Sequence, residues 1–455
     1  MSAKAISPLD GRYGRRLEHL GEYFSEYALM RMRVLVELRF LQALDATGLF
    51  SPLSADERGR IKSLQNAFDE DAYRRIKEIE SRINHDVKAC ELFLREKLAL
   101  KQPNMIHFGL TSEDVNNLSY SFLLKEYLEE EQLPQLKMLI ETLLSHAESW
   151  AETPFPARTH GQMASPTTAG KEMAVFIARL LRQYRLLKAF RFTGKLNGAT
   201  GNYSALLTAF PDYDWLAFSR RFMEQHELET NWVTTQIEDH DTWARYFSIT
   251  RQINNIVLDL DRDVWLYLTL GYLTIEAEAG AVGSSTMPHK VNPINFENSE
   301  GNMQISSALL GGLVDKLGNS RLQRDLSDST ASRNIGVALA HSYLAIQETV
   351  KGLKKLQVNA AYCERELENH PELLAEPIQT VLRKEGLVDP YSLLKEITRG
   401  KRVSYQELLN LVDKLDIPAQ TKERLKKLRV KKYLGDAVRI CKLATEEARK
   451  ELAGE

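Results

Sequence analysis

Hydrophobic side chains recur every three or four residues through most of the chain, and this spacing predicts amphipathic helices. An early example begins near Glu22 and ends near Ala46. Further helices are predicted over 55–67 and 72–98, and from Thr111 to about Ser149. The middle of the chain carries the longest periodic segments, which are 165–190, 236–279, 293–316 and 331–356. Shorter segments follow over 364–384, 388–398, 403–414, 417–428 and 433–452.

The lengths of the central segments determine the expected fold class. All of them exceed the usual helix length of about 11–12 residues, and 236–279, as a single helix, would extend about 65 Å at ~1.5 Å per residue. Helices of this length need partners of similar length, which an elongated bundle provides. We therefore expect an all-α protein with three helical domains, namely residues 1–110, a central long-helix bundle over 111–358, and residues 359–455.

Composition and charge exclude several classes of protein. The chain has 455 residues, of which 43% are hydrophobic and 27% charged, as in ordinary globular proteins. Its formal net charge of −2 gives no bulk positive field that would attract nucleic acid or a membrane surface. Its first residues lack a signal-peptide pattern, and no run approaches the ~20 apolar residues that span a bilayer. We therefore expect a cytoplasmic protein with neither nucleic-acid nor membrane partners.

The three cysteines, Cys90, Cys363 and Cys441, lie far apart and form no C-x-x-C pair. We therefore expect no disulfide framework and no structural zinc site. The sequence also lacks G-x-x-x-x-G-K-[ST], G-x-G-x-x-G, H-E-x-x-H and G-x-S-x-G. P-loop hydrolysis, Rossmann redox chemistry, zinc proteolysis and α/β-hydrolase catalysis therefore lose support.

The loop over 280–293 has the richest chemistry in the sequence. It combines two glycines, three hydroxyl residues, Lys290 and Asn292 between two predicted helices. Glycines let the backbone close over a ligand, and the amides of the helix that begins near Pro293 suit an anion. Lys290 adds a positive charge, so the loop suits a carboxylate or a developing oxyanion. An ordinary connection between helices is the alternative.

Three further clusters carry candidate groups. His160 lies beside Gly161 in a polar loop before a predicted helix, where an imidazole could donate a proton. His85 adjoins Asp86, although a single histidine is more often a packed or surface residue. The segment 320–333 contains three arginines and five hydroxyl residues, which can bind phosphate or carboxylate but also suit a solvated turn.

The loop from Gly283 to Pro293 resembles the signature loop of the fumarase/aspartase superfamily. Its Met-Pro-His-Lys sequence, with His289, is most similar to the adenylosuccinate lyase family within that superfamily. Other segments agree with the same family, namely Ser7–Tyr13, Asn84–Ala89, Thr111–Asp114, Arg158–Gln162 and Ser320–Arg333. These motifs extend over 7–333 and the helix pattern continues beyond them, so the resemblance covers essentially the whole chain.

The resemblance implies an all-α fold in which the central helices of four subunits form one bundle. It implies a homotetramer whose active sites are shared between subunits, and a β-elimination that releases fumarate without a metal or an organic cofactor. Adenylosuccinate would give AMP, and the succinyl-carboxamide intermediate SAICAR would give AICAR. Another fumarate-releasing lyase, such as an argininosuccinate lyase, and a non-catalytic structural protein with this fold are the alternatives.

The resemblance also assigns roles to individual residues. Ser284 matches the family's base, with Ser285 as the fallback, His160 matches its general acid, and His85 matches a supporting residue. Positions that hold phosphate and nucleotide groups are matched by Arg12, Tyr13, Arg324, Ser329, Thr330, Ala331, Ser332 and Arg333. Positions around the succinyl group and the base are matched by Asn84, Asp86, Thr111, Ser112, Gln236, Lys290, Asn292 and Asn298.

Overall fold

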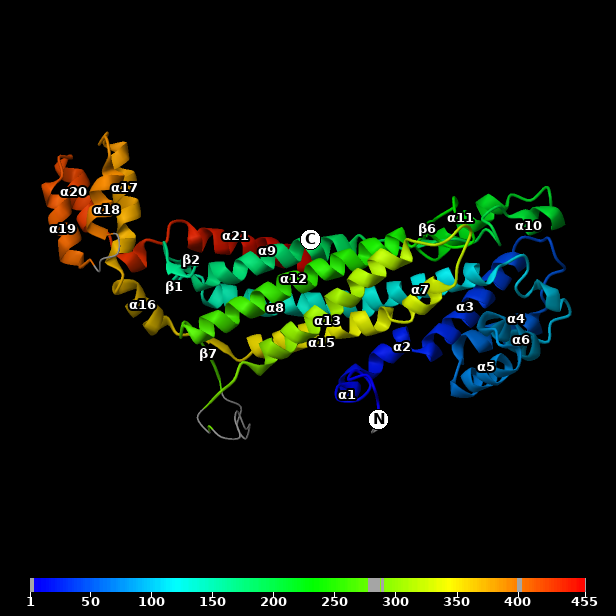
Figure 1. The fold of residues 1–455 in the computed structure, drawn as a ribbon. Helices are drawn as coiled ribbons and strands as arrows, with labels where there is room; N and C mark the ends of the chain where they lie inside the picture. Colours follow the sequence, from blue (N-terminus) through cyan, green and yellow to red (C-terminus); the bar gives the residue numbers. More distant parts are fainter. Residues whose placement is uncertain (1–3, 277–286, 288–289, 399–402, 455) are drawn as a thin grey trace. The chain divides into compact units, whose positions relative to one another are not determined.

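The computed structural model describes residues 4–276, 287, 290–398 and 403–454, and helices dominate it (Figure 1). The chain forms two compact units. Unit 1 comprises residues 1–135, 184–254 and 301–345, and unit 2 comprises 136–183, 255–300 and 346–455. The unit boundaries fall inside long helices, which are α8 (Leu133–Ser149), α9 (Ala169–Lys188), α12 (Asp241–Thr269), α13 (Ile294–Leu317) and α15 (Ile335–Leu353).

Unit 1 is organised around α3 (Glu26–Asp45), which begins where the side chain of Ser25 accepts a hydrogen bond from the N–H of Ala28. Its apolar face, including Leu38 and Phe40, is fully buried. This helix packs against α6 (Asp86–Leu98) and α7 (Ser112–Tyr127). The remaining shorter helices of unit 1 are α1 (Gly14–Leu17), α2 (Gly21–Phe24), α4 (Ala55–Asn66), α5 (Glu70–Ile83), α10 (Ser204–Ala209), α11 (Trp215–Gln225) and α14 (Ser327–Ser332).

The prediction of a single helix over 72–98 is wrong. Asn84 adopts a left-handed backbone with φ 53°, and its N–H bonds the carbonyl of Glu80 to end α5. Nδ1 of His85 then accepts a hydrogen bond from the N–H of Lys88 at 3.2 Å, which starts α6. The interruption exposes Asn84 and His85 between two helix ends, where the periodicity predicts a continuous helix.

The other long predictions agree better with the structure. The segment from Thr111 to Ser149 is nearly continuous, because a π-helical turn over Leu128–Gln132 joins α7 to α8. The predictions over 293–316 and 331–356 are confirmed by α13 and α15 within a few residues. Of the segment 236–279, the structure describes residues up to 276, and within these the helix is α12 alone, since Gly271, with φ 77°, leads into the strand β7 (Leu273–Ile275).

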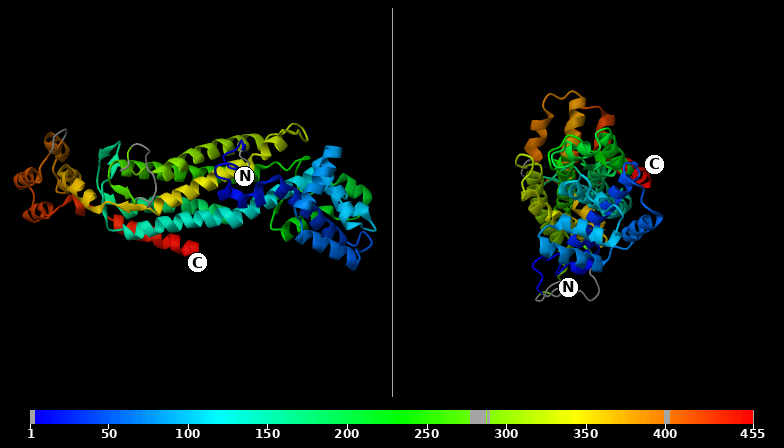
Figure 2. Two further views of the ribbon diagram at one scale, coloured as in Figure 1. Left: turned by 90° about the horizontal axis from the view of Figure 1, so that it is seen from below. Right: turned by 90° about the vertical axis from the view of Figure 1, so that its right-hand side faces the viewer.

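Unit 2 combines helices with short paired strands. Strand β1 (Pro154–Phe155) pairs with β4 (Thr167–Thr168), β2 (Arg158–Thr159) pairs with β3 (Gln162–Met163), and β7 pairs with β8 (Leu356–Val358), all antiparallel. A parallel pair, β5 (Thr193–Gly194) with β6 (Glu229–Thr230), belongs to unit 1. Within unit 2, α12 and α15 lie side by side (Figure 2), where the hydroxyl of Thr349 donates to the buried carboxylate of Asp261 at 2.9 Å.

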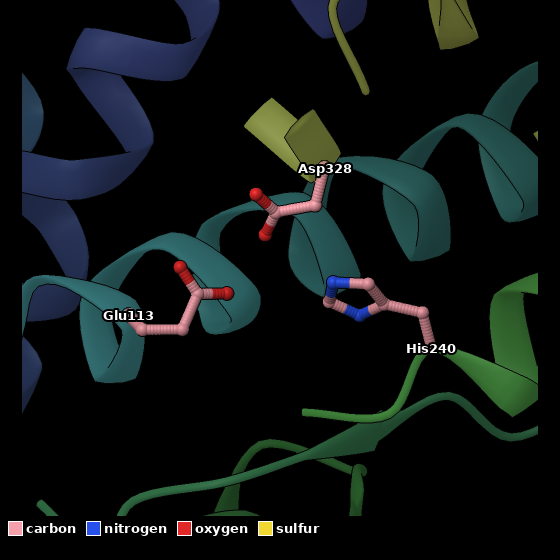
Figure 3. A group of neighbouring side chains, drawn as sticks. All are labelled: Glu113, His240 and Asp328. Atoms are coloured by element: carbon pink, nitrogen blue, oxygen red, sulfur yellow. The ribbon is translucent and has the colours of Figure 1, made fainter. Parts of the chain in front are cut away.

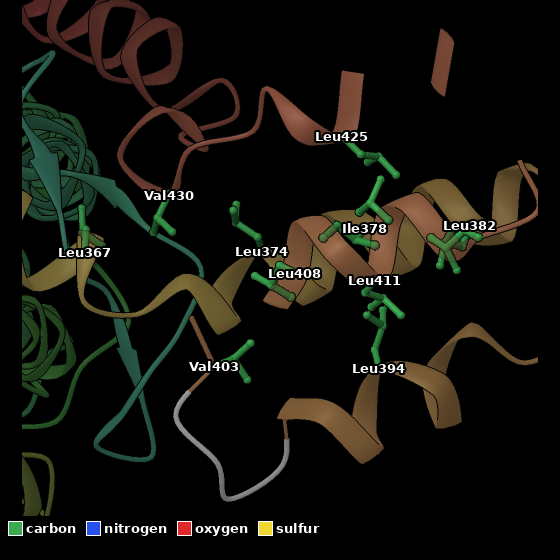
Figure 4. Close-up of a cluster of buried hydrophobic side chains, with 12 residues drawn as sticks. Leu367, Leu374, Ile378, Leu382, Leu394, Val403, Leu408, Leu411, Leu425 and Val430 are labelled. Atoms are coloured by element: carbon green, nitrogen blue, oxygen red, sulfur yellow. The ribbon is translucent and has the colours of Figure 1, made fainter. Parts of the chain in front are cut away.

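The C-terminal part of unit 2 has its own hydrophobic cluster (Figure 4). Leu374, Ile378, Leu382, Leu394 and Leu408 are among its buried members. These five come from a 3₁₀ turn (Pro371–Leu374), α17 (Ala375–Lys384), α18 (Pro390–Thr398) and α19 (Tyr405–Lys414), and α20 (Ala419–Lys426) contributes Leu425. The predicted helix over 364–384 is therefore two helices, because the 3₁₀ turn that begins at Pro371 separates α17 from α16 (Ala360–Glu368).

The last helix, α21 (Ala437–Ala453), contacts α8 within unit 2, where Sγ of Cys441 donates to the carbonyl of Ala147 at 3.4 Å. All three cysteines are buried free thiols. None of the helices in the described part of the chain is long and apolar enough to cross a bilayer.

Candidate functional site

The first turn of α7 carries Thr111 and Ser112, and a buried ion pair anchors it. Oδ1 of Asp114 lies 2.9 Å from Nζ of Lys195, and neither side chain is exposed. The same carboxylate accepts the N–H of Thr111 at 2.9 Å and the N–H groups of Asn197 and Gly198 at 3.1 Å each. These bonds fix the helix start, so the two hydroxyl residues are presented half-buried beside it.

Glu113, the next residue of α7, belongs to a buried group of titratable side chains with His240 and Asp328 (Figure 3). The three come from α7, from the segment before α12 and from α14, and they point toward one another. Their nearest nitrogen and oxygen atoms all lie within 4.8 Å of one another. The guanidinium of Arg324 reaches the same Glu113 carboxylate at 3.3 Å, so the segment 324–333 meets α7 here.

Trp243 and Glu238 both contact the ring of His240. Its ring stacks on Trp243 with centroids 4.1 Å apart, and Nδ1 lies 3.3 Å from the carboxylate of Glu238. Burial alone would lower the pKa of His240, but Glu238, Glu113 and Asp328 outweigh it and raise that pKa. Burial raises the pKa of Glu113, against the lowering effect of His240 and Arg324. The raised pKa of His240 favours an imidazolium, whereas the raised pKa of Glu113 makes that carboxylate easier to protonate.

In the described part of the chain, the donor atoms of Glu113, His240 and Asp328 lie close enough together to share a metal ion. A metal ion at this position would lie beside the guanidinium of Arg324, which already pairs with Glu113. The positive charges of Arg324 and of a protonated His240 compensate the carboxylates. The surroundings therefore fit an imidazolium better than a metal ion.

Glu113, His240 and Asp328 also line a small cavity of about 30 Å³. Its lining includes several residues that the sequence predicts as substrate contacts, namely Asp86, Ser329, Ser332 and Arg333. Asp86 is paired with Arg33 at 2.9 Å. Although burial would raise the pKa of Asp86, Arg33 and the N–H of Val87 lower it overall. Unit 1 thus brings predicted succinyl-side and phosphate-side residues to one cavity.

The helix α14 presents the phosphate-side residues. Oδ1 of Asp328 accepts the N–H of Ser329 at 2.7 Å, and the hydroxyl of Ser332 donates to the carbonyl of Asp328 at 2.9 Å. Arg333 is largely exposed, with Glu26 4.0 Å away, while Thr330 is exposed and Ala331 half-buried. The position of this segment therefore depends on the buried Asp328.

Other predicted contacts of unit 1 lie on loops and helix ends. The exposed guanidinium of Arg12 lies 5.9 Å from the ring centroid of Tyr13, and Tyr13 precedes α1. The side-chain amide of Gln236 donates to the carbonyl of Ala199 at 3.1 Å. His85 presents its exposed ring with Nδ1 already used as an acceptor for Lys88. A neutral His85 therefore carries its proton on Nε2.

His160, in unit 2, lies at the tip of a tight hairpin between β2 and β3. His160 and Gly161 both have positive φ, 53° and 75°, which is the backbone of a type I′ turn. Arg158 braces this hairpin, because its guanidinium donates to the Tyr272 hydroxyl at 2.8 Å and to the carbonyl of Gly161 at 2.9 Å. The imidazole is therefore exposed on a supported turn, as the predicted proton donor requires.

The signature loop is only partly within the structure. Ser284, Ser285 and His289 lie outside the described residues. Lys290 is exposed, and its N–H bonds the carbonyl of Met287 at 3.1 Å. Asn292 precedes α13, Asn298 lies in its second turn, and both side chains are half-buried.

The prediction from sequence missed Glu113, His240 and Asp328. Glu113 belongs to the Thr111–Asp114 motif, where it resembles an ordinary acid in the first turn of a helix. His240 stands in the acidic stretch from Glu238 to Asp241, and this density of acids around a histidine is the signal that could have drawn attention to it.

Comparisons with known proteins agree with the motifs. The chain matches the family model described as Lyase over residues 11–308 and the model described as Adenylosuccinate lyase C-terminal over 320–434. A protein of Haemophilus influenzae named adenylosuccinate lyase is 46% identical, over 96% of this chain and 97% of its own. The protein of that name from Escherichia coli K12 is 46% identical over 96% and 98%, and that from Dictyostelium discoideum is 42% identical over 95% and 96%.

Solved structures share the fold at low identity. A fumarate lyase from Mesorhizobium has a TM-score of 0.78 at 16% identity, covering 94% of this chain and 97% of that one. A 3-carboxy-cis,cis-muconate lactonizing enzyme from Pseudomonas putida has a TM-score of 0.75 at 21% identity, covering 95% and 97%. These likenesses confirm the all-α fold, and the full-length similarity to the curated relatives goes further. The chain belongs to the adenylosuccinate lyase family of the fumarase/aspartase superfamily.

Proposed function

We propose that this protein cleaves adenylosuccinate to AMP and fumarate, and SAICAR to AICAR and fumarate, in purine nucleotide biosynthesis. The observation that carries the proposal is the 46% identity to adenylosuccinate lyases over 96% of the chain. The test is to incubate the purified protein with each succinyl-nucleotide and to separate the products. Release of fumarate from argininosuccinate alone would favour the other lyase activity, and no turnover of any of these compounds would favour a non-catalytic role.

The reaction is a β-elimination that needs a base and an acid. The base removes a proton from the carbon next to a carboxylate, the C–N bond breaks, and the acid protonates the departing nitrogen. In this proposal Ser284 is the base, with Ser285 as the alternative, and His160 is the acid. The exposed position of His160 on a braced I′ turn supports this assignment, because its ring can reach a ligand without unfolding a helix.

In this proposal the signature loop stabilises the negative charges that form during the reaction. A serine hydroxyl is a weak base, so its anion needs neighbouring amides and a cation. Lys290 supplies that charge and also neutralises the extra negative charge that the succinyl carboxylate gains when the proton leaves. His85, in turn, supports the reacting carboxylate from the loop between α5 and α6.

Substrate binding is divided between two sets of residues. Arg12, Tyr13, Arg324 and the segment 329–333 hold the phosphate and the nucleotide, since guanidinium and hydroxyl groups match phosphate oxygens. The succinyl group and the base are held by Asn84, Asp86, Thr111, Ser112, Gln236, Lys290, Asn292 and Asn298. The cavity lined by Asp86, Ser329, Ser332 and Arg333 supports a meeting of both sets.

We further propose a cytoplasmic homotetramer of three-domain subunits, divided at residues 1–110, 111–358 and 359–455. Segments around His85, His160 and Ser284 would then reach each active site from three different subunits. Large apolar side chains exposed on the long helices support this assembly, because a bundle of subunits would bury them. They include Val175 and Leu186 on α9, Leu266 on α12 and Ile305 on α13.

A further inference from the structure

We propose that His240 is a positioning residue that fixes the nucleotide-binding segment 324–333 against the start of α7. This inference rests on the proposed function, because it assigns a cause to the geometry of that segment. His240 also lines the cavity beside this segment, but in this proposal it takes no part in the chemical step. It acts through Asp328 and Glu113, which it holds together.

The position of His240 is determined by its own neighbours. Its ring lies nearly parallel to that of Trp243, at an interplanar angle of 8°. Its backbone N–H donates to Glu238 at 2.8 Å and its Nδ1 lies 3.3 Å from the same carboxylate. Glu238 is itself held by the hydroxyl of Thr193 at 2.9 Å and by the amide of Asn231 at 2.8 Å. These contacts therefore fix the position of the imidazole.

The ring of His240 lies beside the carboxylates of Glu113 and Asp328 (Figure 3), and their nearest nitrogen and oxygen atoms lie within 4.8 Å of one another. Both carboxylates are almost fully buried, Glu113 at 3% exposure and Asp328 at 5%. Two buried carboxylates repel each other unless a cation lies between them. Arg324 compensates Glu113 at 3.3 Å, and a protonated His240, whose nearest ring nitrogen lies within 4.8 Å of both carboxylates, adds a second positive charge beside Asp328 and Glu113.

Asp328 transmits this restraint to the binding segment. It directly precedes Ser329, and its side chain and carbonyl bond Ser329 and Ser332. Ser329, Ser332 and Arg333 line the adjoining cavity. A neutral residue at 240 would leave Asp328 and Glu113 unbridged, so α14 would move away from α7 and the phosphate would lose its partners.

The test measures ligand affinity separately from chemistry. His240→Gln should weaken AMP binding and raise KM for adenylosuccinate about tenfold, as expected for one charge-assisted contact, while inhibition by fumarate stays within about twofold. Neutralising the unbridged carboxylate should repair this defect, so His240→Gln combined with Asp328→Asn should recover most of the AMP affinity. A merely structural role would not produce that recovery.

His146→Gln is the matched control, because His146 also stacks on a tryptophan, Trp150 at 4.3 Å, but its ring bonds a neutral group, the carbonyl of Leu353. It should lower thermal stability without changing AMP affinity. If His240→Gln does not fold, Asp328→Asn alone should still weaken AMP binding selectively. The wild-type protein provides the reference, since failure to release fumarate from adenylosuccinate would contradict the proposed function itself.

Three results would overturn the role of His240 in an active enzyme. The first is AMP affinity that stays unchanged in folded His240→Gln or in Asp328→Asn. The second is an equal loss of AMP and fumarate affinity without recovery in the double variant. The third is a stoichiometric metal ion in the purified wild-type protein that His240→Gln loses, which would make the group a metal site.

Discussion

Nζ of Lys195 lies 2.9 Å from Oδ1 of Asp114, and both side chains are completely buried. A buried ion pair of this kind contributes little compared with apolar residues of the same shape, but removing one partner leaves an uncompensated charge. Because Asp114 also holds the N–H groups of Thr111, Asn197 and Gly198, the pair joins the start of α7 to the loop after β5. The geometry of Thr111 and Ser112 depends on it.

Lys195→Met should therefore destabilise the protein strongly, by about 3–5 kcal/mol. Urea unfolding of the two proteins measures this difference. Lys442→Met is the control, because Lys442 is 59% exposed and pairs with Glu152 at 3.5 Å on the surface; its effect should stay within about 0.5 kcal/mol. Similar small effects for both variants would contradict the role assigned to Lys195.

Arg324→Lys should weaken substrate binding by about 1–3 kcal/mol. Lysine keeps the charge but loses the planar fork that matches phosphate oxygens, and it also loses the geometry of the contact with Glu113. Steady-state kinetics with both succinyl-nucleotides measure the change, which should fall mainly on KM. Arg321→Lys should leave KM unchanged, since Arg321 is 83% exposed. Wild-type kinetics for Arg324→Lys would place Arg324 outside the site.

Treatment with a chelator should leave the rate of fumarate release unchanged. The proposed chemistry uses a serine hydroxyl, an imidazole and an ammonium group, and Arg324 occupies the position beside Glu113 that a cation would need. The measurement compares the purified protein before and after EDTA and dialysis. A rate that falls and returns with one added divalent metal would show that the elimination requires that metal.

Glu57 should make stability depend on pH at the acid end. The N–H of Lys101 and then the N–H and hydroxyl of Ser54 lower the pKa of Glu57 to about 2, below its unfolded value near 4.3. The stabilisation is therefore complete above about pH 4.3 and is lost as the pH falls through about 2.

Glu57→Gln should consequently cost about 0.5–2 kcal/mol at pH 7, as loss of a helix cap does. The difference from wild type should shrink as the pH approaches 2, which urea unfolding at several pH values measures. Glu407→Gln is the comparison, because Glu407 caps α19 through Ser404 alone and should have a smaller effect. A constant difference across this pH range would rule out the carboxylate as the cause.

Mixed assembly tests the shared active sites. His160→Ala and Ser284→Ala should each be nearly inactive alone. If each site takes these residues from different subunits, random reassociation gives roughly a quarter of sites with both positions intact. Recovered activity near that fraction is the expected result. Mixed tetramers that form but remain inactive would mean that one subunit supplies both residues.

The local sequence pattern determines where most of the helices of this protein lie. The period of apolar side chains predicted α13 and α15 closely, because amphipathic helices bury one face whatever their partners are. The ends of helices are harder to predict from this period, since they depend on single residues such as Asn84 and Gly271, whose backbone takes positive φ. The motif loops were recognisable because chemistry restricts residue types at adjacent positions. The resemblance of these loops to a known family is what makes Asp86, Ser329 and Arg333 candidates for substrate binding.

Tertiary structure decided which of these groups meet. Glu113, His240 and Asp328 are far apart in the sequence, and each alone resembles an ordinary polar residue. Only folding excludes water around them, which turns separate charges into a coupled group and raises the pKa of His240. Sequence periodicity reports which face of a helix is buried, whereas the partner of a buried charge depends on how distant helices pack. That dependence is why the sequence suggests candidate residues for substrate binding but does not reveal the buried group of Glu113, His240 and Asp328.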